Sequence, residues 1–351
     1  MGSLLARATP RPVELPPLRR GTRATVGTFY QIGKDGRLHV VVILKQRFGI
    51  SWNGDPVPIP GAEIRAADEL WDENCPEESS IKFASDLCLS KTATDIVVHG
   101  SAQARGGATV TELDVFVRVG PVERALKVFG PRTWTKTMGG VILSPPQPFD
   151  SLSLRWEYAY GGSDFTDDKK PLQEARNPVG RGLARSADKL ADKPGPQIED
   201  PTALLKNHRQ SPTPAGLFPV GRHWEPRRSF AGTMDDAWRK ERMPIPPFDF
   251  DDRFNQIAPL GLIAPGFLRG GEAVEVLGMN EKGALRFVLP RRAYYTGAVT
   301  AAGAKEYRNQ LDTVVLFPND EAVELTWRSA IPVRSRIGGI REIQVHDKER
   351  R

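Results

Sequence analysis

Two aspartates in one short segment are the first candidates for chemistry. Asp249 and Asp251 stand two residues apart in the segment FDFDDRF, so a strand would place both carboxylates on one face, as in some glycosidase or cation sites. The segment is equally compatible with a solvated loop whose acids pair with Arg242 or Arg253. We favour the loop and keep the hydrolase as an alternative.

His223 and Glu225 form a second candidate acid–base pair, although no nucleophile accompanies them. None of the five histidines stands at metal-ligand spacing, since HExxH is absent, and the two cysteines do not form a CxxC. The glycine-rich segments 177–182 and 269–271 match neither a Walker A loop nor a dinucleotide fingerprint, and no serine sits in a GxSxG elbow. The sequence therefore predicts no catalytic set, no cofactor and no metal.

Strands are the elements that must position these residues. Residues 152–160 alternate apolar and polar side chains, which predicts one half-buried strand. Three aromatic rings share its core face: Trp156, Tyr158 and Tyr160. Because each aromatic side chain removes about 150–250 Å² from water, this strand is our candidate for the centre of the core.

A turn-rich loop follows that predicted strand. Gly161 and Gly162 permit backbone conformations that other residues avoid. Rigid strands commonly position functional loops, so Asp164, Asn177 and Arg181 could be placed for recognition. A long surface loop without a binding role is the simpler interpretation, and the residues alone favour it.

Short apolar runs separated by turn residues predict a mainly β fold. Glycine and proline together supply 63 of the 351 residues, from 33 and 30, and they lie between these runs. Strands are expected over residues 39–48, 57–59, 95–99, 113–119, 124–129, 272–277, 285–289, 313–317 and 322–328. Their hairpin spacing predicts sandwich-like or open-barrel antiparallel sheets. Few short helices are expected, with one over 235–242 capped by Asp235 or Thr233 and another conceivable near 65–70.

The chain divides into an arm, one domain and a tail. We expect an N-terminal arm over 1–22, a single β-rich domain over 23–340 and a charged, frayed tail over 341–351. The domain comprises a first strand set (23–160), a loop-rich wrapping segment (161–260) and a second strand set (261–340). The Pro/Gly-rich wrapping segment either wraps the sandwich or forms a satellite lobe. Its aromatic residues would pin it: Phe218, Trp224, Phe230, Trp238, Phe248, Phe250 and Phe254.

Composition narrows the possible partners and the compartment. The formal net charge is +6, from 49 basic and 43 acidic residues that are interleaved, so nucleic-acid binding is not indicated. Cys75 and Cys88 are expected to be free thiols in a reducing compartment. No apolar run has the length of a signal peptide or a membrane span. We therefore expect a cytoplasmic protein that does not insert into a membrane.

Several sequence blocks occur in a fixed order along nearly the whole chain. They are KTATDIVVHG (91–100), VFGPRTW (128–134), WEYAYGG (156–162), NPVGRG (177–182), WEPR (224–227), AGTMDDAW (231–238), RMP (242–244), DFDDRF (249–254), GGE (270–272) and the final hairpin over 311–327. Together these blocks resemble a bacterial family catalogued as domain of unknown function 2169 (DUF2169), which is found with type VI secretion systems.

This resemblance implies a role in handling another protein. Proteins of the family look like non-enzymatic adaptors or chaperones that bind a secreted effector protein and help to load it onto the spike or a PAAR-type tip. The candidates for partner binding or for anchoring of the loops are Trp134, Trp156, Tyr158, Tyr160, Asp164, Asn177, Arg181, Trp224, Arg227, Asp235, Trp238, Arg242, Asp249 and Arg253. Aromatic residues and arginine are the types that carry binding energy at interfaces, which supports the first role without excluding the second.

Two other functions stay open from the sequence. One is a hydrolase acting on carbohydrate or nucleotide through Asp249 and Asp251, or through His223 and Glu225. The other is a scaffold component of the secretion particle. The oligomeric state is not predicted.

Overall fold

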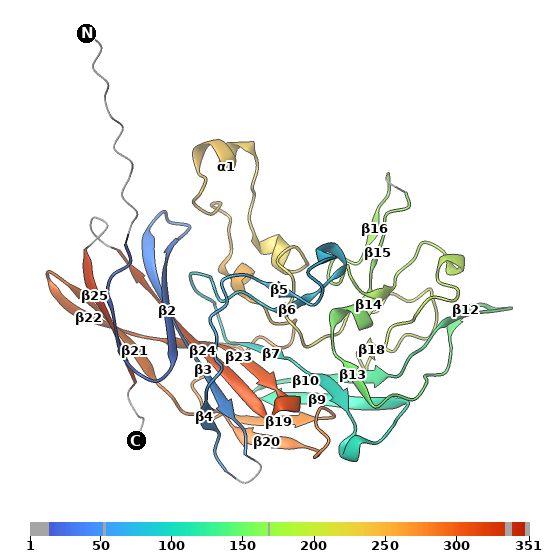
Figure 1. The fold of residues 1–351 in the computed structure, drawn as a ribbon. Coiled ribbons are helices and arrows are strands. Elements are labelled where there is room, and N and C mark those ends of the chain that lie inside the picture. The colour runs from blue at the N-terminus through green and yellow to red at the C-terminus, as the bar shows by residue number, and fades with distance from the viewer. Residues whose placement is uncertain (1–13, 52–53, 168, 334–338, 348–351) are drawn as a thin grey trace.

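The computed structural model describes residues 14–51, 54–167, 169–333 and 339–347 (Figure 1). The fold is mainly β, as predicted, with several mostly antiparallel sheets, and no sheet of the described chain closes into a barrel. The helical elements of these ranges are one short α-helix, α1 (Asp236–Glu241), and the 3₁₀ turns η1 (Pro76–Glu78), η2 (Arg105–Gly107), η3 (Trp156–Tyr158), η4 (Ala187–Lys189), η5 (Arg227–Phe230), η6 (Asp252–Asn255) and η7 (Pro318–Asp320).

A six-stranded sheet forms one layer of the molecule. Its members, in spatial order, are β2 (Thr25–Ile32), β3 (Leu38–Gly49), β24 (Ala322–Pro332), β23 (Gln310–Phe317) and β7 (Asp95–Val98), with β4 (Val57–Ile59) also paired to β3. All pairs are antiparallel except β23 with β7. The strand predicted over 39–48 is confirmed, and its apolar part is buried on both faces, since Val40 to Leu44 have no exposed surface. Residues 52–53, between β3 and β4, lie outside the described residues.

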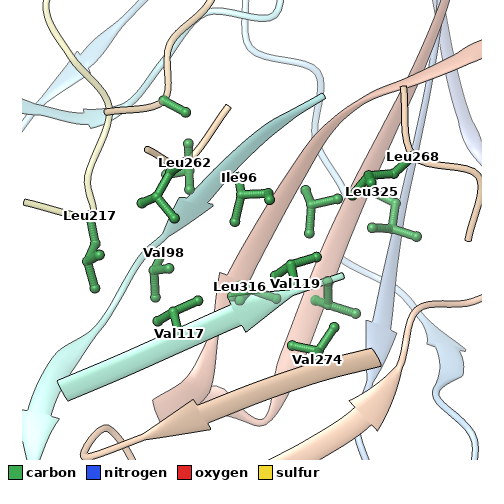
Figure 2. Packing of buried hydrophobic residues seen from close by; sticks show 14 of the residues in the cluster. Ile96, Val98, Val117, Val119, Leu217, Leu262, Leu268, Val274, Leu316 and Leu325 are labelled. Carbon is green, nitrogen blue, oxygen red and sulfur yellow. The ribbon is translucent and has the colours of Figure 1, made fainter. Parts of the chain in front are cut away.

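A five-stranded sheet packs against the first. Its order is β18 (Ile198–Glu199), β10 (Val122–Phe129), β9 (Glu112–Val119), β19 (Ala273–Leu277) and β20 (Leu285–Val288). Figure 2 shows the contact layer, where Ile96 and Leu316 of the first sheet meet Val117 and Val274 of the second. The period-two alternation of β9 places Val115, Val117 and Val119 in this core while the residues between them face outward. The predicted sandwich-like packing follows from that alternation.

A four-stranded sheet joins sequence-distant segments. Its order is β1 (Leu18–Gly21), β25 (Ile340–Asp347), β21 (Tyr294–Thr300) and β22 (Gly303–Arg308), with β1 parallel to β25. The frayed tail expected from residue 341 is therefore wrong as far as Asp347, and part of the expected arm is strand β1. The prediction followed the charged residues of this segment, but the apolar residues between them, Ile340, Ile343 and Val345, are buried in the core. Residues 348–351 and 1–13 lie outside the described residues.

The single strand predicted over 152–160 is wrong. The segment forms β13 (Ser151–Ser153) paired to β8 (Ser101–Gln103), then the turn η3, then β14 (Tyr160–Gly161) paired to β17 (Arg181–Gly182). The buried Asn177 explains the break, because its side-chain amide donates to the carbonyl oxygens of Trp156 and Tyr160, both at 2.9 Å. A polar side chain thus replaces the neighbouring strand that these carbonyls would otherwise need.

The strands of the wrapping segment 161–260 are short, with two residues each in the part that the structure describes. Besides β17 and β18 it contains the small hairpin β15 (Ser163–Asp164) with β16 (Leu172–Gln173). One part joins the main core through Leu217, Phe218 and Trp224. Another part closes a separate small cluster over the hairpin of β11 (Trp134–Thr137) and β12 (Gly140–Leu143), whose buried members are Trp134, Val141, Tyr160, Leu190 and Leu205. The segment therefore contributes both to the main core and to a separate small cluster.

No helix forms near residues 65–70, where one was considered. Leu70 instead belongs to β5 (Glu69–Leu70), which pairs with β6 (Ile81–Phe83). The carboxylate of Asp86 accepts from the backbone N–H of Arg65 at 2.8 Å, and Asp86 N–H donates to the Arg65 carbonyl. These contacts hold the segment extended over the outer face of the six-stranded sheet.

Candidate functional site

A projecting loop carries four of the fourteen candidate residues predicted from the sequence. We call residues 231–250 the α1 excursion, because α1 stands at its tip, away from the sheets, at the top of Figure 1. The chain leaves the body at Phe230 and returns at Asp251, whose backbone N–H donates to the Phe230 carbonyl at 3.0 Å. The Arg253 guanidinium lies over the Phe230 ring at 4.2 Å and closes the neck of the loop.

The helix begins where the sequence predicts. Asp235 is the N-cap, and its carboxylate accepts from the backbone N–H of Trp238 at 2.8 Å. The indole N–H of Trp238 donates to the Ile245 carbonyl at 2.9 Å and folds the returning chain back onto the helix. A six-residue helix has little intrinsic stability, so these two contacts hold it.

Arg242 fastens the excursion to the turn between β2 and β3. Its Nε donates to the Pro246 carbonyl at 2.5 Å, and a terminal nitrogen donates to the Lys34 carbonyl. Its guanidinium lies 3.5 Å from the centroid of the Phe248 ring. The Lys34 ammonium in turn donates to the Phe250 carbonyl at 3.2 Å. The loop is therefore held from two directions.

Asp249 closes the loop from within. Its carboxylate accepts from the Thr233 N–H at 2.9 Å and from the Thr233 hydroxyl at 2.7 Å. These bonds, the backbone N–H first, lower the pKa of the Asp249 carboxyl. Gly232, which precedes Thr233, has a φ of +77°. A Cβ at this position would lie 2.9 Å from the backbone nitrogen of Phe250, so glycine is required.

The excursion presents apolar side chains to solvent. Met234, Met243 and Phe248 are 52%, 61% and 84% exposed. Phe248 also lines a pocket of about 410 Å³, whose lining residues are Thr233, Asp235, Ala237, Trp238, Glu241, Arg242, Ile245, Pro247, Phe248 and Asp249. Four predicted candidates, Asp235, Trp238, Arg242 and Asp249, thus come together at one place.

Phe248 is the main correction within this site. It was expected to pin the wrapping segment to the sandwich, but most of its ring faces solvent. The prolines that precede it give the reason, since Pro244, Pro246 and Pro247 favour an extended backbone that carries the chain away from the core. Neither Phe248 nor the methionines were among the predicted site residues, and this proline-rich run next to apolar side chains is the signal that could have found them.

Six other candidates are buried and can only anchor the fold. They are Trp134, Trp156, Tyr160, Asn177, Trp224 and Arg227. Arg227 is representative: it donates to the Val220 carbonyl at 2.6 Å and to the Phe254 carbonyl at 3.0 Å, and burial lowers its pKa to about 10. The indole N–H of Trp156 likewise donates to the carbonyls of Phe218 and Pro219, both at 3.1 Å. These side chains pin the wrapping segment from inside.

The remaining loop candidates lie on another part of the surface. Arg181 stacks on the Tyr158 ring at 4.6 Å and donates to the Gln197 side chain at 3.3 Å. Asp164 lines a pocket of about 510 Å³ beside the β14–β17 pair. Its carboxylate accepts from the Lys189 ammonium at 3.1 Å, and hydrogen bonds led by that from Thr166 hold its pKa far below the usual range. Asp164 and Asn177 are therefore used in shaping the loop.

The residues of the hydrolase alternative are engaged locally. Asp251 caps η6 and pairs with Arg253 at 2.6 Å, while Asp249 binds Thr233 as described. His223 Nε2 accepts from the Trp224 indole at 2.9 Å, and the Glu225 carboxylate accepts from Ser229. Each group thus stabilises a turn of its own, and none of them lines the interior cavity described next.

A row of polar side chains is buried across the six-stranded sheet. In register, Lys45 of β3, Thr326 of β24, Thr313 of β23 and Asp95 of β7 are neighbours. The Lys45 ammonium lies 2.9 Å from Asp86 and 3.2 Å from Glu324, so its charge is balanced. The sequence analysis did not predict this buried polar row. Strand β24 contains only one acid and one base, Glu324 and Arg328, so its sequence does not indicate a cluster of charged residues.

Three buried polar atoms in or next to this row have no hydrogen-bond partner, and their residues line one small cavity. They are His99 Nε2, Glu324 Oε2 and Thr326 Oγ1. The cavity measures about 30 Å³, which suits a water molecule and is far smaller than the sites that take small-molecule ligands. Although ionisable groups converge here, the space does not admit a carbohydrate or a nucleotide.

Other expectations can be compared with the described chain. No group of three or more histidine, cysteine, aspartate or glutamate residues in the described ranges is arranged to hold a metal ion. Cys75 and Cys88 are free thiols. Within these ranges the α-helix has six residues, and no helix is long and apolar enough to cross a membrane.

Comparison with known proteins adds one finding. A family described as "Uncharacterized protein conserved in bacteria (DUF2169)" matches residues 35–328. The chain belongs to this family. No curated protein and no solved structure matches it. The part matched to DUF2169 contains the whole α1 excursion and both packed sheets except β2 and the end of β24, whereas β1 and β25 lie outside it.

Proposed function

We propose that this DUF2169 protein is a non-enzymatic adaptor or chaperone that holds another protein, and that the α1 excursion is its docking surface. The observation that carries the proposal is the exposure of Met234, Met243 and Phe248 on a loop that polar contacts hold in one conformation. Exposed apolar groups on a fixed backbone bind at a low entropic cost. Methionine and aromatic residues are also enriched at protein interfaces.

The partner we propose is an effector protein of a type VI secretion system, which the adaptor would help to load onto the spike or a PAAR-type tip. The support for this identity is the ordered set of sequence blocks that the chain shares with DUF2169. We place the action in the cytoplasm, where Cys75 and Cys88 stay reduced. Burial raises the pKa of the Cys88 thiol, which keeps it protonated and unreactive.

Co-purification with the product of the adjacent coding region tests the proposal. The full chain and the double variant Met243→Ser/Phe248→Ser are compared for retention of the co-expressed effector. We expect retention to fall at least tenfold, because the few central residues that dominate an interface each cost more than about 1 kcal/mol when truncated, and the proposal places Met243 and Phe248 among them. An effector that is not retained by the wild-type chain, and whose level in the cell is unchanged when this protein is deleted, contradicts the proposal.

A matched control comes from another exposed methionine. Met138, at the turn of the β11–β12 hairpin, is fully exposed. Strand β12 lies well apart from α1 in Figure 1. Met138→Ser should leave effector retention unchanged, and all variants should melt within about 1–2 °C of the wild type, since exposed apolar residues contribute little to folding. Equal loss in the control would indicate non-specific adhesion.

A further inference from the structure

The pocket beside α1 is acidic as well as aromatic. Its lining contains three carboxylates, those of Asp235, Glu241 and Asp249, and one base, Arg242. Three acids against one base give a formal charge of −2 at the pocket, whereas the whole chain carries +6. We infer that this pocket receives an arginine side chain of the partner polypeptide. The inference rests on the proposed function, because it names what the docking surface recognises.

Arg242 does not occupy the place of that partner residue. Its Nε is used by the Pro246 carbonyl and a terminal nitrogen by the Lys34 carbonyl. Its guanidinium covers one face of the Phe248 ring, from 3.5 Å. It therefore forms a wall of the pocket and leaves the carboxylates without a cation within it.

Glu241 supplies the free acceptor. The Asp235 carboxylate caps the helix, and the Asp249 carboxylate binds Thr233. The Glu241 carboxylate, by contrast, makes no hydrogen bond or ion pair with the residues that the structure describes. On α1, Glu241 follows Ala237 and Trp238 by four and three residues, so the three share one helix face. A guanidinium at this face can form two parallel hydrogen bonds to the Glu241 carboxylate.

The aromatic rings favour arginine over lysine. Phe248 is 84% exposed, so ring surface stays open although Arg242 covers one face. Trp238 adds a second ring to the lining. A planar guanidinium stacks on such rings while it binds a carboxylate, whereas an ammonium acts as a hydrated point charge. The exposed Met234 and Met243 adjoin the lining residues Asp235 and Arg242 in sequence, and they suit apolar residues next to the arginine.

Short peptides on the full chain test the inference directly. The probes are acetyl-Leu-Arg-Leu-amide and its lysine and citrulline counterparts, and the readout is the NMR signal of the Trp238 indole N–H. We expect the arginine peptide to shift this signal in a saturable manner, the lysine peptide to do so more weakly, and the neutral citrulline peptide hardly at all. Raising the salt concentration should weaken the binding of the arginine peptide, because salt screens ion pairs at exposed sites.

Two variants that each remove one negative charge from α1 sharpen the test. Glu241→Gln should weaken the binding of the arginine peptide about two- to fivefold, as expected for the loss of a partly exposed ion pair. Asp236→Asn should leave it unchanged, because Asp236 already pairs with Arg239 at 2.8 Å and does not line the pocket. Equal effects of the two variants, or equal binding of arginine and citrulline peptides, would overturn the inference.

The outcomes separate this inference from the proposed function. If Met243→Ser/Phe248→Ser releases the effector while no peptide shifts Trp238, the docking surface stands and the arginine pocket is wrong. If the arginine peptide binds and Glu241→Gln weakens it while no effector is ever retained, the pocket stands and the adaptor proposal is wrong.

Discussion

Single residues of the same type serve opposite purposes in this protein. Trp224 is buried and joins the wrapping segment to the core, while Trp238 lines a surface pocket. Arg227 satisfies interior carbonyls, and Arg242 holds an exposed loop. Residue type and spacing predicted that these positions matter, but both readings stayed open, because burial depends on where the segment lies relative to the sheets.

His99 makes the folded protein sensitive to acid. Its ring stacks on Phe83 at 4.5 Å and on Trp71 at 5.6 Å, and burial, followed by the charge of Lys82, lowers its pKa to about 4. An unfolded histidine has a pKa of about 6.5, so between pH 6.5 and 4 the unfolded chain binds the extra proton and stability falls as the pH falls. At about 1.4 kcal/mol per pKa unit, the loss should approach roughly 3 kcal/mol.

Urea unfolding at pH 7 and pH 4.5 checks this prediction. We expect His99→Phe to lose less stability between these two values than the wild type, because the aromatic neighbours are kept and the titrating group is removed. An identical drop in both proteins would mean that other groups account for the acid sensitivity.

At the scale of elements, strands with simple alternation were predictable and locally interrupted segments were not. The runs of β9 and β19 bury apolar residues at every second position, and the runs of β3 and β24 were predictable from their apolar content, since they are buried almost continuously. The break at η3 depends on Asn177, which is 21 residues from Trp156 in sequence. Strand β25 was missed because its charged residues dominate the composition of the segment, and β21 and β22 because small and polar residues dilute their pattern. Long-range partners decide such elements.

Asn177 should be required for the β14–β17 pair. Asn177→Ala removes both hydrogen bonds to the carbonyls of Trp156 and Tyr160 and leaves these buried acceptors without a donor. We expect a loss of about 2–4 kcal/mol in the free energy of unfolding, from two bonds of about 1 kcal/mol and the penalty for unsatisfied groups. The measurement is chemical denaturation, with the exposed Asn74→Ala as control. A loss below 1 kcal/mol would show that the turn holds itself.

The buried lysine of β3 should be costly to remove. Lys45→Met leaves Asp86 and Glu324 buried with one cation fewer between them. Breaking a buried ion pair on one side typically costs about 3–5 kcal/mol. As a control, Arg118→Met on β9 breaks a pair whose members are about half exposed and should cost less than about 1 kcal/mol. Similar values for both variants would contradict the burial argument.

At the scale of the whole molecule, the packed sheets and the α1 excursion are separable. The main core draws on segments from Ala24 to Val345, and none of its buried residues comes from 231–250. The sequence could predict the sandwich-like layers, because they follow from strand periodicity. It could not predict that one stretch of the wrapping segment stands out from them, because that depends on a neck formed by Phe230, Asp251 and Arg253.

Replacing residues 231–250 by a short glycine–serine linker should therefore preserve the fold. Phe230 and Asp251 are already joined by a hydrogen bond of 3.0 Å, so few residues are needed to bridge them. We expect near-unchanged thermal unfolding together with complete loss of effector retention. A shortened chain that aggregates or unfolds would show that the loop supports the core, and one that still retains the effector would place the docking surface elsewhere.

The parallel pairing of β1 with β25 has a consequence for biosynthesis. Leu18 lies opposite Ile343, so strand β1 lacks the strand with which it pairs until residues 340–347 have been synthesised. Both packed sheets can assemble before that moment, because β24 is complete by Pro332. Pairing of β1 with β25 can thus follow assembly of the two packed sheets during synthesis.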